Sequence, residues 1–212
     1  MESEQLVNLY MTGFGQFGSC KTNPTSDIIN EIDLSPLEQI AGYKINVEIR
    51  EVVDVDIDSV NSALDHIQDA LQNHIEDGSR NLILHLGVSQ GASEICLEKQ
   101  ALNVMNFSIP DMQGNQPMDE KIDKGEEIDH ILHCKLNIDS ICEKLKDNKH
   151  ICSDSTDAGS YICNYTYYCS LREHQDIENA EVIFVHVPTF KTIPKEDQME
   201  CIIDIIKNWI LG

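Results

Sequence analysis

The chain has 212 residues, 37 of them acidic and 15 basic, which gives a formal net charge of −22. The acidity argues against nucleic acid or an anionic membrane as a partner, since both favour Lys and Arg. Hydrophobic residues make up 41% of the chain, too many for a disordered protein, and the length predicts a single domain over residues 1–212 with a full hydrophobic core.

The first half of the chain predicts alternating strands and helices. Continuous apolar runs indicate buried strands, alternating apolar residues indicate a strand with one buried face, and steps of three and four indicate a helix. Asn23 is a good N-cap, and Pro24 fits the first turn of a helix. In chain order we expect a strand at Leu6–Thr12, a helix from Pro24, a strand at Tyr43–Val53, a helix over Asp56–Asp77 that stops at Gly78, and a strand at Asn81–Val88.

The second half is less regular. Residues 94–104 fit a strand or a helix equally well, and residues 109–127 carry two prolines among polar residues, which predicts a long loop. We then expect a helix over Ile128–Lys146, a short strand at Ile151–Ser155, a helix at Tyr161–Leu171, a strand at Val182–Val187 and a last helix after Pro194. This order predicts an α/β domain whose largely parallel sheet is covered on both faces.

The eight cysteines form no CxxC pair and have no regular spacing: Cys20, Cys96, Cys134, Cys142, Cys152, Cys163, Cys169 and Cys201. No apolar run approaches the roughly 18 residues of a membrane span, and the first residues have no signal-peptide pattern. We therefore expect a cytoplasmic protein, not bound to a membrane, whose cysteines are free thiols.

Gly13 to Gly18 spell GxGxxG directly after a predicted strand, the fingerprint of a dinucleotide site. Pro24 argues against that interpretation, because it would lie inside the crossover helix at a cost of about 3 kcal/mol. The preferred interpretation is a glycine-containing loop that presents Phe14 and Phe17 to a small, flat, neutral ligand. The alternative is that both rings pack into the core.

Three residues suggest nucleophilic catalysis. Cys163 follows a glycine turn at the start of a predicted helix, whose positive end favours a thiolate. His186 ends an apolar strand at the sheet edge where α/β active sites gather, and an imidazole there can exchange a proton with a thiol. Glu98 is a candidate to orient that imidazole, although no local feature distinguishes it from the other acidic residues. His85 is a competing strand histidine, and a structural role is the alternative for each of these residues.

His130, His133 and Cys134 have helical spacing and are candidate metal ligands. Because no fourth ligand lies near them in the sequence, we expect no metal site.

Taken together, these segments resemble pyroglutamyl peptidase I, the pyrrolidone-carboxylate peptidase family of cysteine peptidases. The resemblance runs from Met11 to Pro188, and its motifs are specific by their order and spacing. They are Thr12–Gly18 followed by Asn23 and Pro24, His85–Ser89, Leu97–Lys99, Ile109–Asp111 with Gly114–Pro117, Asp157–Gly159 with Tyr161–Asn164, and Phe184–Pro188.

The resemblance implies an omega-peptidase that removes N-terminal pyroglutamate from peptides. It places the nucleophile at Cys163, its imidazole at His186 and the acid at Glu98, with Phe14 and Phe17 flanking the pyrrolidone ring. It also implies an open α/β/α sandwich, no metal or organic cofactor, and either a monomer or a homo-oligomer.

Two positions depart from the family pattern. Gln16 stands where a proline is common, and Ser108 stands where many relatives carry an arginine, which puts the support of an oxyanion in doubt. Two rival functions stay open: a weak or inactive pyroglutamyl-binding homologue, which the Ser108 departure suggests, and a nucleotide-binding oxidoreductase, which rests on the GxGxxG motif. Cys169, six residues after Cys163, is a candidate resolving thiol, with a packed helix residue as the alternative.

Overall fold

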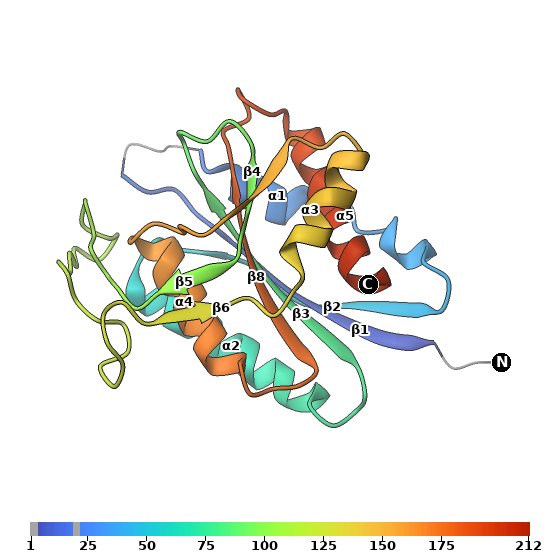
Figure 1. Cartoon of the computed structure of the whole chain (residues 1–212), viewed down its shortest axis with the longest axis horizontal. Helices are drawn as coiled ribbons and strands as arrows, with labels where there is room; N and C mark the ends of the chain where they lie inside the picture. Colours follow the sequence, from blue (N-terminus) through green and yellow to red (C-terminus); the bar gives the residue numbers. More distant parts are fainter. Residues whose placement is uncertain (1–3, 19–21) are drawn as a thin grey trace.

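In the computed structural model, which describes residues 4–18 and 22–212, a central sheet lies between two layers of helices (Figure 1). The six strands of this sheet have the spatial order β2 (Tyr43–Val53), β1 (Gln5–Phe14), β3 (Arg80–Val88), β8 (Ala180–Val187), β4 (Ile95–Glu98) and β7 (Cys152–Ser155). The helices are α1 (Pro24–Glu31), α2 (Ile57–Leu71), α3 (Ile138–Asp147), α4 (Ile162–His174) and α5 (Lys195–Leu211). A small second sheet pairs β5 (Gln100–Leu102) with β6 (Ile131–His133).

The central sheet is largely parallel, which confirms the expected α/β fold. β1, β2, β3 and β8 all pair in parallel, whereas β4 is antiparallel to β8 and β7 follows the direction of β4. The carboxyl ends of the four parallel strands therefore share one edge of the sheet. Because β4 runs in the opposite direction, its first residues lie near that edge.

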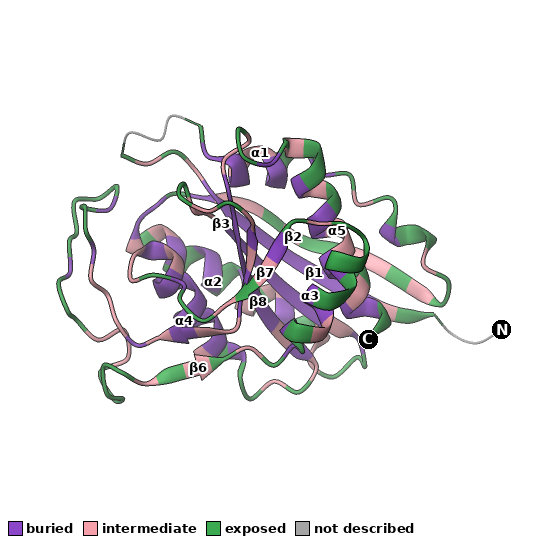
Figure 2. Ribbon diagram, turned by 45° about the horizontal axis from the view of Figure 1, so that its top comes forward, coloured by how far each residue is buried: buried purple, intermediate pink, exposed green. Residues whose placement is uncertain are grey.

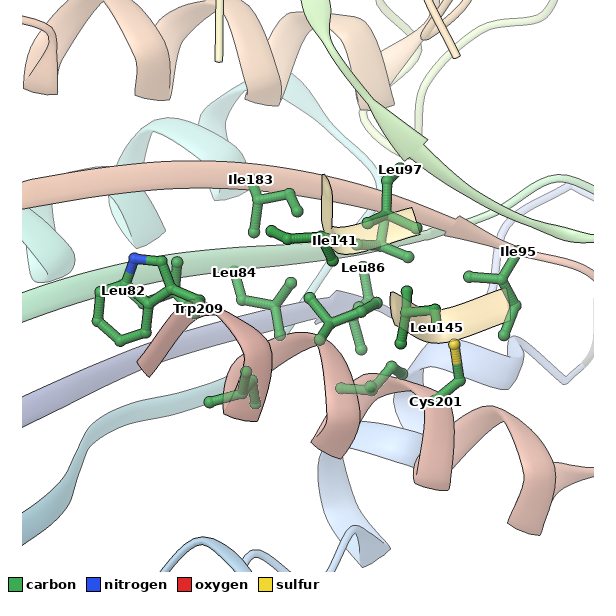
Figure 3. Close-up of a cluster of buried hydrophobic side chains, with 14 of the residues drawn as sticks. Leu82, Leu84, Leu86, Ile95, Leu97, Ile141, Leu145, Ile183, Cys201 and Trp209 are labelled. Carbon is green, nitrogen blue, oxygen red and sulfur yellow. The ribbon is translucent and has the colours of Figure 1, made fainter. Parts of the chain in front are cut away.

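Each face of the sheet supports its own hydrophobic core, because successive side chains of a strand point to opposite faces. On β3, Leu82, Leu84 and Leu86 pack towards α1, α3 and α5 (Figure 3), while Ile83 packs towards α2 and α4. Figure 2 shows the central strands buried between the two helical layers. The continuous apolar runs in the sequence reflect burial on both faces.

Local signals place most of the element boundaries correctly. Helix α1 begins at Pro24, with the Asn23 side chain accepting a hydrogen bond from the Thr25 backbone N–H. The helix expected over residues 56–77 ends earlier, at Leu71, and a short 3-10 helix follows before Gly78, whose φ is +77°. The ambiguous residues 94–104 contain β4 and β5.

The helix predicted over Ile128–Lys146 is wrong in its first half. Residues 131–133 form β6, which pairs with β5 some thirty residues earlier in the chain. The helix begins only at Ile138, where Asn137 caps it by accepting a hydrogen bond from the Ser140 backbone N–H. A strand that depends on a distant partner leaves little trace in local periodicity, so the periodicity alone extends the predicted helix too far.

The cysteines that the structure describes are all free thiols, and Cys20 lies outside the described residues. Within residues 4–18 and 22–212, no helix is long and apolar enough to cross a membrane.

Candidate active site

A cavity of about 320 Å³ lies at the shared carboxyl edge of the parallel strands. The triad and ring residues expected from the sequence come from segments that lie far apart in the chain. All five line this one cavity: Phe14, Phe17, Glu98, Cys163 and His186.

The centre of the cavity is an imidazole between a carboxylate and a sulfur. Nδ1 of His186, near the end of β8, lies 2.8 Å from Oε1 of Glu98, the last residue of β4. The Cys163 side chain, in the first turn of α4, hydrogen-bonds the same imidazole. Because Nδ1 faces Glu98, Nε2 is the ring nitrogen that is left for the sulfur. Glu98 is 1% exposed and His186 is 8% exposed, so water screens these charges little.

The pKa of His186 reflects this environment. Burial disfavours the charged imidazolium and lowers the pKa, but the negative charges and hydrogen bonds of Cys163 and Glu98 outweigh it and raise the pKa to about 10. His186 therefore carries its proton at neutral pH, as an acid that protonates a leaving group must.

Gly87 is a site residue to which the sequence analysis assigned no role. It pairs with His186 across β3 and β8, and a Cβ built on it would lie 2.9 Å from Sγ of Cys163. The sequence did mark Gly87, because it belongs to the His85–Ser89 motif. The role of this glycine depends, however, on where helix α4 crosses the sheet.

The two phenylalanines line the cavity in different ways. Phe14, at the end of β1, is 3% exposed and belongs to the core under α2 and α4. Its backbone N–H donates to Oγ1 of Thr25 at 2.8 Å, which ties the strand end to α1. Phe17 is half-buried, with its ring centroid 6.3 Å from that of Tyr161, another cavity residue. Phe14 is therefore packed in the core, as the alternative interpretation has it, and it also lines the cavity.

The glycine-rich segment does not have the geometry of a dinucleotide site. Strand β1 runs on through Phe14, and α1 begins at Pro24, six residues after Gly18, so its N-terminus does not follow the glycines directly. The Asn23 side-chain amide instead donates to the Gly15 carbonyl at 2.9 Å and holds the loop in place. This geometry excludes the nucleotide-binding alternative, for the reason that Pro24 already indicated in the sequence.

His85 and Cys169 lie away from the cavity. His85 is 1% exposed, with Nδ1 2.7 Å from Oγ1 of Thr12 and Nε2 2.9 Å from Oγ of Ser170. Burial, and then the charge of His174, lower the pKa of His85 to about 3. Cys169 is buried in the core, where burial raises its pKa to about 12. Both residues are packed parts of the fold.

The remaining candidates contribute no ligand or charge to the cavity. In the part of the chain that the structure describes, no group of three or more His, Cys, Asp or Glu side chains is arranged to hold a metal ion, and this includes His130, His133 and Cys134. Ser108 is exposed and does not line the cavity, and the described lining residues include no Lys or Arg.

A sulfur beside an imidazole that a carboxylate orients, at the carboxyl edge of an α/β sheet, defines the class of cysteine hydrolases. A family model described as pyroglutamyl peptidase matches residues 7–202. The chain belongs to the pyroglutamyl peptidase family and is a cysteine peptidase.

Individual relatives agree with this assignment. The chain is 30% identical over 185 residues to a pyrrolidone-carboxylate peptidase of Brevibacillus brevis, with 86% of this chain and 79% of that protein covered. It is 28% identical over 187 residues to one from Thermococcus litoralis, with 86% and 77% covered.

Solved structures have the same fold. The pyrrolidone carboxyl peptidase from Thermococcus litoralis superimposes with a TM-score of 0.75 at 26% identity, over 94% of this chain and 91% of that chain. A mutant pyrrolidone carboxyl peptidase from Pyrococcus furiosus gives a TM-score of 0.77 at 25% identity, over 94% and 96%.

Proposed function

We propose that this protein is an omega-peptidase that hydrolyses the amide bond after an N-terminal pyroglutamyl residue, with Cys163, His186 and Glu98 as its catalytic groups. The observation that carries the proposal is that one cavity brings these three side chains together with two phenylalanine rings. The relatives that are named pyrrolidone-carboxylate peptidases support the same substrate class.

In the proposed reaction, the Cys163 thiolate attacks the carbonyl carbon of the pyroglutamyl residue. As the C–S bond forms and the C–N bond breaks, His186 gives its proton to the departing amine. Water then attacks the thioester while His186 takes one of its protons, which releases pyroglutamate and restores the thiolate–imidazolium pair. Glu98 holds Nδ1 of His186 through both steps, and no cofactor takes part.

The start of α4 offers groups for the developing oxyanion. The first backbone N–H groups of a helix have no partner within it, and Cys163 lies in the first turn of α4. We assign the oxyanion site to these N–H groups, because backbone donors aimed at a developing negative charge stabilise the transition state.

The lining of the cavity supports selection of a neutral ring. Phe14, Phe17, Val55, Tyr161 and Ile162 provide an apolar wall. A pyroglutamyl lactam has no charge, whereas an ordinary N-terminus would bring an ammonium group into this wall. Burial of that charge costs several kcal/mol without a partner, so specificity arises from exclusion of charged N-termini.

A second candidate is a homologue that binds pyroglutamyl groups without turnover. The observation that favours it is Ser108, because no arginine supports the oxyanion from that position. We place the protein in the cytoplasm, where the nucleophile stays reduced, as either a monomer or a homo-oligomer.

The test is release of aminocoumarin from a pyroglutamyl-aminocoumarin substrate. We expect release by the wild-type protein, loss of release in Cys163→Ala, and retained release in Cys134→Ser, a control because Cys134 does not line the cavity. Binding of pyroglutamate by a wild-type protein that releases no fluorophore would support the second candidate. Release that survives Cys163→Ala would overturn the proposed nucleophile.

A further inference from the structure

The strand order indicates how a substrate would be oriented in the cavity. Phe14 ends β1, on one side of β3 and β8, while Cys96 lies in β4, on the other side. In the proposed reaction the carbonyl carbon bonds to the Cys163 sulfur, above β3, and the leaving nitrogen takes a proton from His186 on β8. The pyroglutamyl ring is therefore on the β1 side of the bond, and the leaving residue is on the β4 side.

The strand register places Cys96 next along this path. Gly87, His186 and Cys96 are direct neighbours on β3, β8 and β4, so their side-chain positions point to the same face of the sheet. The Cys163 sulfur rests above Gly87 at one end of this row. Cys96 is at the other end, beyond the imidazole, where it is half-buried and lines the cavity. A peptide that leaves past His186 therefore continues over Cys96.

The wall of the cavity on the β7 side is polar, and the turn that follows β7 adds a negative charge. The Cys96 sulfur is 3.7 Å from the Ser153 hydroxyl on β7, and Ser155 at the end of that strand lines the cavity. Asp157 also lines the cavity, and its Oδ1 accepts a hydrogen bond from the Gly159 backbone N–H at 2.9 Å, which fixes the carboxylate. Among the described lining residues no Lys or Arg balances this charge.

We propose that Cys96 and Asp157 form the subsite for the residue that follows pyroglutamate, and that they select a compact residue that is not acidic. This inference rests on the proposed function. Cys96 limits the size of the leaving residue because it stands in the row immediately after His186. Asp157 repels an acidic side chain and attracts a basic one across the cavity.

The size selection is tested with two variants, one that enlarges the side chain at position 96 and one that shortens it. The ratio of kcat/KM for pyroglutamyl-alanine amide over pyroglutamyl-phenylalanine amide cancels any general loss of catalytic power. We expect Cys96→Leu to raise this ratio at least fivefold and Cys96→Ala to lower it, with Cys134→Ala, away from the cavity, within twofold of wild type. A ratio that moves less than twofold in both Cys96 variants overturns the assignment of Cys96.

The charge selection is tested with Asp157→Asn, which keeps an Oδ1 acceptor for the Gly159 N–H. The ratio of kcat/KM for pyroglutamyl-lysine amide over pyroglutamyl-glutamate amide should exceed one in the wild type and fall at least threefold in the variant. Added salt should reduce the wild-type ratio, because screening weakens charge selection. Asp33→Asn, at an exposed carboxylate that does not line the cavity, is the matched control, and an equal fall in both variants overturns the role of Asp157.

Turnover of the pyroglutamyl-aminocoumarin substrate distinguishes a failure of the proposed subsite from a failure of the proposed function. A wild-type protein that cleaves it, with ratios that do not respond to either residue, overturns only the subsite. A wild-type protein without turnover overturns the proposed function and the subsite with it.

Discussion

The Cys163 sulfur occupies the space that a side chain on Gly87 would need. A Cβ on residue 87 would lie 2.9 Å from Sγ, and 2.7 and 2.8 Å from Cζ and Cε1 of Phe184. Carbon atoms in favourable contact are about 3.5–4.0 Å apart. Glycine at this point of β3 therefore lets the first turn of α4 approach the sheet closely enough for the sulfur to meet His186.

Gly87→Ala should displace the sulfur and impair both catalysis and folding. We expect kcat to fall about 100-fold, the usual effect of a misplacement of about 1 Å, and the free energy of unfolding to fall by about 1–3 kcal/mol. Steady-state kinetics and urea unfolding measure the two effects. Gly91→Ala is the control, because a Cβ there meets nothing within 4 Å, and equal kcat in both variants would contradict the close approach.

Glu98→Gln should shift the pH dependence of the enzyme. The charge of Glu98 helps to raise the pKa of His186 to about 10, so its removal lowers that pKa. The imidazolium is the acid that protonates the leaving amine, and it is lost as the pH rises through this pKa. We expect the alkaline limb of kcat/KM near pH 10 in the wild type and at lower pH in the variant, with kcat at pH 8 reduced by about 10²–10⁴.

The matched control for that profile is Glu94→Gln, a nearby carboxylate that does not line the cavity. Its alkaline limb should coincide with that of the wild type. A limb that stays near pH 10 in Glu98→Gln would show that Glu98 does not set the protonation of His186.

Phe17→Ala should weaken substrate binding without unfolding the protein. Its ring is half-buried at the cavity, so we expect KM to rise at least tenfold while the rate of Cys163 alkylation by iodoacetamide stays within about twofold. Equal losses in both measurements would mean that the ring shapes the site and does not contact the ligand.

Phe14→Ala should raise KM as well, but its ring is 3% exposed. Truncation of a buried phenylalanine removes about 3–5 kcal/mol from the free energy of unfolding. Urea unfolding of the two variants should therefore separate them, with Phe14→Ala clearly the less stable. Similar midpoints would contradict the packing of Phe14 under α2.

His85→Gln should make the stability less sensitive to acid. Burial lowers the pKa of His85 to about 3, while an unfolded histidine titrates near 6.5. The neutral, buried form therefore stabilises the fold above about pH 6.5, and this contribution is lost as the pH falls towards 3. We expect the urea midpoint to fall less between pH 7 and pH 4.5 in the variant than in the wild type. The exposed His66→Gln should follow the wild type, and an identical fall in His85→Gln would contradict a neutral His85.

The sequence by itself determined the elements whose signals are local. Continuous apolar runs predicted β1, β3 and β8, because burial on both faces requires apolar side chains at every position. Asn23 and Pro24 predicted the start of α1, because capping and proline geometry involve only neighbouring residues. The order and spacing of short motifs identified the family, with Cys163 and His186 in the segments that carry them.

Only the tertiary structure decided how distant residues meet. No local feature distinguishes Glu98, and it reaches His186 because β4 pairs with β8 in antiparallel register. The same register brings Cys96 to the cavity, and the pairing of β6 with β5 replaced part of a predicted helix. Such contacts depend on which strands become neighbours in the sheet, and the packing of the whole chain settles that, since local periodicity records only how each segment is buried.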